Sequence, residues 1–181
     1  HDQGSHYYHD FDLFYTNSRF SLQNQYFDSC HVHLLPFAAS TKIHKPINIQ
    51  KKFDVVVVGH ARQDRIELIE KLRKEFKVKT FGKGWGVDST EVQGKSQVKA
   101  INLGKVYLSF PQTIAGYYNV KVGLFEAAAC KSCIVMPYVD EVEHYFTYGT
   151  DILGYTDFAM LKELLFEHLE NNSRRSWIAE N

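Results

Sequence analysis

A carboxylate inside an apolar, alanine-rich stretch is the first residue here whose placement requires a chemical explanation. Glu126 lies in NVKVGLFEAAACKSCIVMP, residues 119–137, where a helical pattern leads directly into a β-branched run. Burying a carboxylate is costly unless something pairs with it. With two acceptor oxygens, Glu126 could bind the neighbouring hydroxyls of a ribose. The alternative is a glutamate in the first turns of a helix that only favours the helix dipole.

Basic residues follow another candidate strand and are the second chemical feature. Arg62 and Arg65 flank the start of a helical pattern, directly after a run that ends in Gly59. The free N–H groups and the dipole at such a helix N-terminus favour a phosphate. Lys121 could be a further cation for a diphosphate. Each of these side chains could instead be a solvated surface charge.

The segment FGKGWG is a third candidate for ligand contact. Gly82 and Gly84 allow a close approach of the backbone, and Trp85 could offer a flat face to a base or a sugar. A packing role for Trp85 in a turn is an equal alternative. Asn119, two residues before Lys121, completes the candidate ligand-binding residues.

Cysteines and histidines raise the question of redox or metal chemistry. Cys130 and Cys133 form a C-x-x-C, but a helix ends at the first and a strand begins near the second, the reverse of a thioredoxin-like pair. No second C-x-x-C is present to complete a zinc site. Five histidines are concentrated in the first fifth of the chain: His1, His6, His9, His31 and His33. No acidic or thiol partner recurs around them at a ligand spacing, so we expect no metal site.

Composition limits the class of protein. The chain has 181 residues, 44% of them hydrophobic and 23% charged, with 21 basic and 21 acidic residues, which describes one globular domain plus some extra chain. A net charge near zero without a basic run does not favour a nucleic-acid or membrane-surface protein. There is no transmembrane run or signal peptide, and three cysteines are too few for a secreted disulfide framework. We predict a cytoplasmic protein and, because no initiating Met is present, a fragment of a longer one.

The elements that must position these residues alternate along the chain. Residues 53–59, FDVVVVG, form a run typical of a strand buried on both faces of a parallel sheet, and helical spacing follows over residues 62–76. Further strands are predicted at 77–82, 106–110, 133–137 and 151–155. The predicted helices are at 95–103, around Glu126, at 141–146, at 158–172 with Thr156 or Asp157 as cap, and at 173–181 with Ser173 as cap.

Such an alternation predicts an α/β protein with a doubly wound parallel sheet. Ligands bind such sheets at the carboxyl ends of the strands. The segments at 59–65, 82–86, 111–121 and 138–144 follow strands, and Glu126 lies just beyond the third. The candidate residues therefore gather into one predicted site.

The residues before Phe53 have a weaker pattern. Residues 11–16 and 32–38 read as short strands, and residues 18–27 as a helix opened by Ser18. Residues 40–52, with Pro46 and four lysines, read as a linker. We divide the chain into a connecting segment at 1–52 and a ligand-binding domain at 53–181.

The order of motifs resembles a known family. DVVVVGHARQDRIELI, VKTFGKGWG, AINLGKVYLSF, FEAAACKSCIVMP and RRSWIAEN are similar in order to the C-terminal half of a GT-B glycosyltransferase, over about residues 11–181. The closest variety is the group that resembles the bacterial spore protein CgeB, related to glycosyltransferase family 4. The resemblance implies a Rossmann-like domain that holds a nucleotide-sugar donor. Glu126 matches the residue that binds the donor ribose, Arg65 a cation near the diphosphate, and FGKGW a loop near the base.

Three positions depart from the family pattern. Lys131 stands where the family usually has glycine, Gly123 where it often has arginine, and Tyr118 where it has an acidic partner of the glutamate. Lys121 could replace the arginine.

The resemblance implies transfer of a sugar from a nucleotide-diphosphate sugar, with a UDP-sugar as the expected donor and no cofactor or metal. Residues 1–52 would be the last part of an N-terminal acceptor-side domain or the connection to it. The chain alone is expected to bind a nucleotide better than it catalyses, and the sequence assigns no catalytic residue. The alternatives are a non-catalytic nucleotide-sugar binding module and a nucleotide-sugar epimerase of the same fold.

Overall fold

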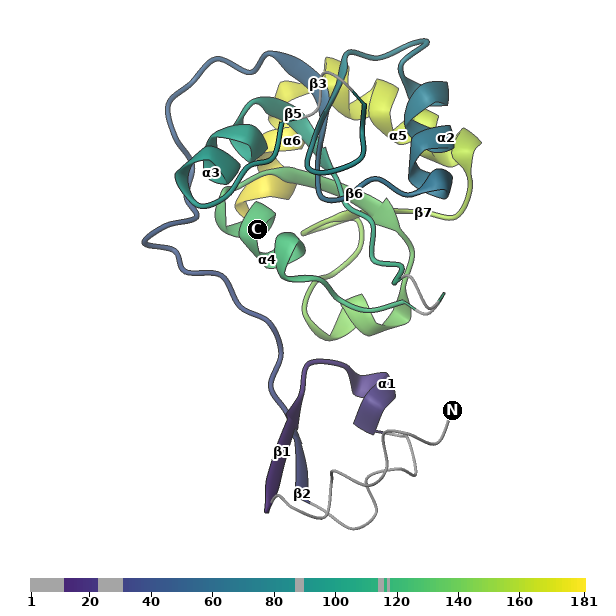
Figure 1. Cartoon of the computed structure of the whole chain (residues 1–181). Coiled ribbons are helices and arrows are strands. Elements are labelled where there is room, and N and C mark those ends of the chain that lie inside the picture. The colour runs from purple at the N-terminus through teal and green to yellow at the C-terminus, as the bar shows by residue number, and fades with distance from the viewer. Residues whose placement is uncertain (1–11, 23–30, 87–89, 114–115, 117) are drawn as a thin grey trace. The chain divides into compact units, whose positions relative to one another are not determined.

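The computed structural model describes residues 12–22, 31–86, 90–113, 116 and 118–181. It divides into two compact units, His1–Ala38 and Ala39–Asn181 (Figure 1). In the first unit, β1 (Leu13–Thr16) pairs in parallel with β2 (His31–Leu34), and α1 (Arg19–Leu22) follows β1. Both strands are shorter than predicted, and residues 23–27 of the expected helix lie outside the described residues. Ser18 precedes α1, but its hydroxyl makes no hydrogen bond in the part of the chain that the structure describes.

The second unit contains a parallel sheet of five strands in the order β4-β3-β5-β6-β7. The strands are β3 (Phe53–Val58), β4 (Val78–Phe81), β5 (Gly104–Leu108), β6 (Cys133–Pro137) and β7 (Leu153–Tyr155). The helices are α2 (Gln63–Leu72), α3 (Lys95–Asn102), α4 (Val122–Ala129), α5 (Phe158–Glu170) and α6 (Asn172–Glu180), with a 3₁₀ helix η3 (Asp140–His144). The predicted doubly wound parallel sheet is confirmed.

Alternating side chains of the strands supply two cores, one on each face of the sheet. Val56 belongs to the core that α3 and α4 cover, together with Ile101 and Leu124. Val55 and Val57 belong to the core beneath α2, α5 and α6. Both faces of β3 are therefore buried, as its unbroken β-branched sequence predicts. Figure 1 shows the two groups of helices on opposite sides of the sheet.

The strand order creates a switch point between β3 and β5. From β3 the chain crosses to β4 on one side, and from β4 it crosses back to β5 on the other side of β3. The loops after β3 and β5 therefore diverge toward opposite faces of the sheet. In open α/β sheets, the crevice at such a point is where ligands bind.

The last two helices begin where the polar caps place them, with one correction. Asp157 caps α5, because its carboxylate accepts a hydrogen bond from the Met160 amide at 2.9 Å. The prediction of Ser173 as the cap of α6 is wrong. Asn171 is the cap, and its side-chain oxygen accepts from the Arg174 amide at 2.9 Å. Asn is as good an N-cap as Ser, and Asn171 is also the C-cap of α5, which ends at Glu170, so α6 begins directly after it.

The segment before β3 is bound to the second unit, although its sequence predicts a linker. The buried side chain of Asn102, at the end of α3, accepts from the Ile47 amide at 3.1 Å and donates to the Lys45 carbonyl at 3.2 Å. The Lys52 amide donates to the Leu103 carbonyl at 2.8 Å. Residues 39–52 therefore lie within the larger compact unit. The boundary at residue 52 stays a prediction about domain organisation.

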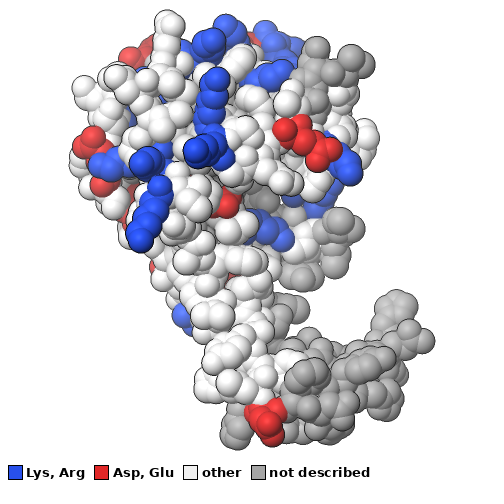
Figure 2. Space-filling model, turned by 60° about the vertical axis from the view of Figure 1, so that its left-hand side comes forward, with Lys and Arg blue, Asp and Glu red and all other residues white. Residues whose placement is uncertain are grey.

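Charges are mixed on the surface of the second unit. Figure 2 shows Lys and Arg side chains spread over this face, with Asp and Glu between them. This distribution agrees with a formal net charge of zero. An anionic ligand must therefore be recognised by a local group of cations.

None of the helices in the described ranges is long and apolar enough to cross a membrane.

Candidate functional site

A cavity of about 830 Å³ lies at the carboxyl ends of β3 and β5, at the switch point. Its volume is in the range of small-molecule sites. Predicted residues in its lining are Gly59, Arg62, Arg65, Gly82, Lys121 and Glu126. Gly84, Trp85 and Asn119 are outside this lining.

Glycine at position 82 is required by contact between two loops. A Cβ atom on Gly82 would lie 2.2 Å from the Gly59 carbonyl oxygen, and the φ angle of Gly82 is +125°. The Gly59 amide donates to the Phe81 carbonyl at 2.8 Å, and the Ala61 amide to the Lys83 carbonyl at 2.8 Å. These two N–H groups are thus used within the protein. The close approach that we predicted for a ligand is made by the chain itself.

Trp85 supports the same loop pair. Its indole N–H donates to the Gly59 carbonyl at 2.7 Å, and its ring packs against the core beneath α2. Trp85 therefore has the packing role that was the alternative to ligand contact, and it does not line the cavity. Asn119 is buried, and its side-chain oxygen has no hydrogen-bond partner among the described residues.

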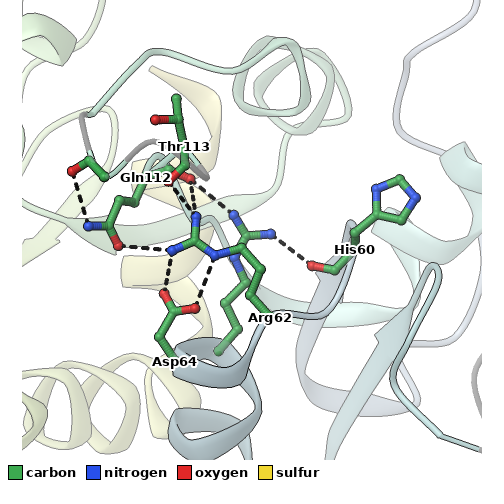
Figure 3. A network of polar contacts seen from close by, with 7 residues as sticks. His60, Arg62, Asp64, Gln112 and Thr113 are labelled. Atoms are coloured by element: carbon green, nitrogen blue, oxygen red, sulfur yellow. Dashed lines mark hydrogen bonds and ion pairs between the residues drawn. The ribbon is translucent and has the colours of Figure 1, made fainter. Parts of the chain in front are cut away.

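Arg62 binds the loop after β5. Its guanidinium forms two hydrogen bonds with Asp64, at 3.1 and 3.0 Å, and donates to the carbonyls of Gln112 and Thr113 at 3.0 and 2.7 Å. A fifth bond goes to the side-chain oxygen of Gln112. Figure 3 shows this network, with the ring of His60 turned away from it. Arg62 thus has its charge balanced by Asp64 and positions the loop.

Arg65 has a different environment on the next part of α2. It donates to the carbonyls of His60 and Gln112, at 2.8 and 3.2 Å, and lies 5.2 Å from the centre of the Phe110 ring. It forms no ion pair within the described residues, and its buried Nε has no partner there. Burial, and then the nearby charge of Arg62, lower the pKa of Arg65. The side chain is a fixed positive charge at the cavity that no carboxylate among the described residues pairs with directly.

Lys121 is the N-cap residue of α4, and no side chain caps this helix. Burial lowers the pKa of Lys121, and the charges of Arg65 and Arg62 lower it further. Lys121 forms no ion pair with any described residue. The first turn of α4, at Val122 and Gly123, also lines the cavity, so the positive end of its dipole adds to these cations. This side of the cavity favours an anion.

Glu126 lies on the second turn of α4, with 14% of its side chain exposed. Its Oε2 accepts a hydrogen bond from Nε2 of Gln97 on α3, and its Oε1 lies 3.3 Å from Nε2 of His44. The carboxylate is therefore held by two side chains from other segments. Because an ionised carboxylate has about four acceptor sites, it can still accept bonds from a ligand.

Gln97, Tyr107 and His44 are among the residues around Glu126 and α4 that were not predicted from the sequence. Gln97 lines the cavity, and its position after the loop that follows β4 is the signal that could have identified it. Tyr107 is a buried strand residue whose hydroxyl lies 3.2 Å from the place of a Cβ on Gly123. A larger side chain at position 123 would therefore meet this hydroxyl. His44 had no sequence signal, because it lies in the expected linker.

Cys130 and Cys133 do not line this cavity. Cys130 and Cys133 are both buried and unpaired, and they lie in opposite cores of the sheet, as expected of small apolar side chains. Burial raises the pKa of the Cys133 thiol to about 12. A thiol of this kind is unreactive. In the described ranges, no three His, Cys, Asp or Glu residues are placed to hold a metal ion. His1, His6, His9 and Cys30 lie outside those ranges.

A family model described as Glycosyl transferase-like matches residues 62–181, which is most of the second unit and includes most of the residues that line the cavity. The chain belongs to this glycosyl transferase-like family. No curated protein sequence matches the chain significantly.

Solved structures of glycosyltransferases share the fold. Sucrose-phosphate synthase from Thermosynechococcus elongatus has a TM-score of 0.69 at 12% identity, over 93% of this chain and 52% of that one. A mutant of S. aureus TarM, in complex with fondaparinux, alpha-GlcNAc-glycerol and UDP, has a TM-score of 0.69 at 13% identity. The match covers 96% of this chain and 40% of that one. Anabaena HepE, in complex with UDP and glucose, has a TM-score of 0.67 at 11% identity. The match covers 94% of this chain and 56% of that one.

These structural matches establish the architecture of the second unit. A parallel five-stranded sheet with helices on both faces is the fold of the Rossmann-like C-terminal domain of GT-B glycosyltransferases. The chain spans about half or less of the length of the solved chains. Sequence identities of this size show the fold alone.

Proposed function

We propose that this chain holds the nucleotide-sugar donor of a glycosyltransferase, which transfers the sugar to an acceptor. One observation carries the proposal. A single cavity at the switch point contains a cationic side, from Arg65 and Lys121, and a held carboxylate, Glu126. A nucleoside diphosphate has the matching parts, a diphosphate and a ribose with two neighbouring hydroxyls.

The diphosphate would bind on the cationic side. Burial lowers the pKa of Lys121 most, and the positive charge of Arg65 lowers it further, so the two cations repel each other in the absence of an anion. A diphosphate between them relieves this repulsion and gains charge-assisted hydrogen bonds. The first turn of α4 has no side-chain cap, so its N–H groups and dipole favour the same anion.

The ribose would bind at Glu126. Gln97 donates to Oε2 and His44 contacts Oε1, and the remaining acceptor sites of the carboxylate can accept the 2′ and 3′ hydroxyls. This is the role that the family resemblance implies for the glutamate of FEAAAC.

The finer assignments belong to the same proposal. UDP is the expected nucleotide, and it is the nucleotide in the TarM and HepE complexes. We assign the chain to the CgeB-like group related to family 4 on its motifs. Because the solved chains are about twice as long, an acceptor-side domain would complete the enzyme, and this chain alone binds rather than catalyses.

A calorimetric and thermal-shift screen of UDP, GDP, ADP and CMP tests the proposal. A ligand that binds only the folded state stabilises it by about 2.7 kcal/mol at a hundredfold excess over Kd. We expect UDP to give the largest shift and a measurable binding heat. The absence of both signals for every nucleotide at millimolar concentration would contradict the proposal.

A further inference from the structure

The contact between His44 and Glu126 connects the segment before β3 to the cavity. His44 Nε2 lies 3.3 Å from Oε1 of Glu126, and only 11% of the His44 side chain is exposed. Glu126 lines the cavity and His44 does not. The imidazole therefore contacts the carboxylate from behind, on the side away from a ligand.

The backbone on both sides of His44 is fixed. The amides of Ile43 and His44 donate to the Ser40 carbonyl, at 3.0 and 2.8 Å, and close a turn. Directly after it, the side chain of Asn102 binds the backbone of Lys45 and Ile47. A histidine held in this way presents Nε2 to the carboxylate at a defined place.

The tautomer of the ring follows from its surroundings. Because a carboxylate only accepts hydrogen bonds, the 3.3 Å contact between Nε2 and the Glu126 carboxylate favours the form of the ring that has its hydrogen on Nε2. The other ring nitrogen, Nδ1, is buried and has no partner in the described part of the chain. Among the described residues, Glu126 is therefore the polar contact of the ring.

We propose that His44 is the positioning residue of the Glu126 carboxylate, and that it prepares this carboxylate for ribose. The inference rests on the proposed function of the cavity and deepens it. Gln97 holds Oε2 and His44 holds Oε1, so both oxygens are fixed before a ligand arrives. A carboxylate fixed in advance loses less rotamer freedom on binding, which favours the ligand.

Two amide substitutions at position 44 separate the contact with Glu126 from the space that the imidazole fills. In His44→Gln the side-chain amide extends about as far as Nε2 and can still donate to Glu126. In His44→Asn the amide corresponds to the nearer nitrogen, Nδ1, and falls short. Ile43→Ala is the control in the same turn, because Ile43 is half exposed and its apolar side chain has no hydrogen-bonding group to offer the carboxylate. The melting temperature of each variant shows that it folds.

Calorimetry with UDP and 2′-deoxy-UDP gives the readout. We expect His44→Asn to weaken UDP binding about three- to tenfold, the worth of one hydrogen bond of ordinary strength, and to reduce the preference for ribose. His44→Gln should restore both, and Ile43→Ala should behave as wild type. In a Glu126→Gln background, His44→Asn should add little, because its effect passes through Glu126.

The outcomes distinguish this inference from the proposed function. Wild type that binds UDP and prefers ribose, with the same preference in His44→Asn, would overturn the role of His44 alone. Equal loss in the Glu126→Gln background, or no rescue by His44→Gln, would overturn it as well. Wild type that binds no nucleotide would overturn the proposed function and this inference with it.

Discussion

Arg65 donates a hydrogen bond to the carbonyl oxygen of Gln112 at 3.2 Å, and so joins the first turns of α2 to the loop after β5. The same guanidinium contacts the His60 carbonyl after β3. One side chain thus bridges the two strand ends that define the switch point. Carbonyl oxygens orient the guanidinium without neutralising it, unlike the carboxylate beside Arg62. Its charge remains available to a ligand.

Changing Arg65 to Ala should therefore weaken nucleoside diphosphate binding much more than nucleoside binding. Charge-assisted hydrogen bonds of this kind contribute about 1.5–3 kcal/mol. Calorimetry with UDP and uridine measures the difference, and Arg65→Lys, which retains the charge, should recover part of the loss. Equal losses for both ligands would show that Arg65 acts through the loops that it joins.

Changing Lys121 to Met should weaken UDP binding roughly tenfold and slightly stabilise the free protein. The stabilisation follows from the lowered pKa, because the folded state disfavours the charged lysine. Wild type carries this cost below the pKa of Lys121 in the folded state and loses it as pH rises toward the ordinary value of 10.5. The difference in melting temperature between variant and wild type should be larger at pH 7 than at pH 10. A difference that grows with pH would contradict this.

Changing Glu126 to Gln should reduce UDP binding by about 1–3 kcal/mol and remove most of the preference for ribose over deoxyribose. Fold stability should change little, because the amide of Gln97 can turn and offer its oxygen to the new amide. Glu126→Ala should cost stability as well, since the donors on Gln97 and His44 would lose their acceptor. Chemical denaturation of both variants, beside UDP titrations, tests the distinction. Wild type that binds deoxyribose equally well would remove the ribose role.

Changing Gly82 to Ala should destabilise the fold by more than about 1 kcal/mol, because a positive φ and a steric conflict with the Gly59 carbonyl act together. Gly86→Ala is the matched control. Gly86 also has a positive φ, +96°, but no described atom lies within 4 Å of its Cβ position. The denaturant midpoints of the two variants separate the cost of the positive φ angle, which both positions share, from the cost of the steric conflict at position 82. Similar losses in both would mean that the loops can move apart freely.

Changing Asn171 to Ala should cost about 1 kcal/mol of stability through the lost cap of α6. Ser173→Ala should have almost no effect, since Ser173 lies inside the helix. Urea denaturation of the two variants compares a true cap with a neighbouring hydroxyl. A larger loss for Ser173→Ala would place the start of the helix elsewhere.

The parts of the fold that follow from local pattern were predictable. The run of valines in β3 is buried on both faces, so composition alone marks it as a central parallel strand. Asp157 precedes a strongly periodic helix and caps it. Glu126 lies just after a strand and a loop, and the rule on strand ends was enough to place it at the cavity.

The rest depends on contacts between distant parts of the chain. His44 contacts Glu126 from a segment whose backbone is bound by Asn102, and nothing in residues 40–52 indicates either partner. Trp85 lies in a glycine-rich loop of the kind that contacts ligands, yet its indole N–H donates to the Gly59 carbonyl of the protein itself. Arg62 and Arg65 look equivalent in sequence, but only Arg62 has a carboxylate to pair with, because Asp64 is within reach of its guanidinium.

The hydrogen bonds of Asn102 also define where this domain could be cut or exchanged. A fragment that begins at Phe53 would keep every strand of the five-stranded sheet, yet the buried Asn102 side chain would lose its partners at Ile47 and Lys45 and keep only its bond to the Val98 carbonyl, so its side-chain oxygen would have no partner. Each buried polar group left unsatisfied costs about 1–3 kcal/mol, a large part of the stability of a domain. The same cut would take away His44. The smallest transferable unit therefore starts before Ser40, and recombination between related enzymes would be tolerated there rather than at the first strand.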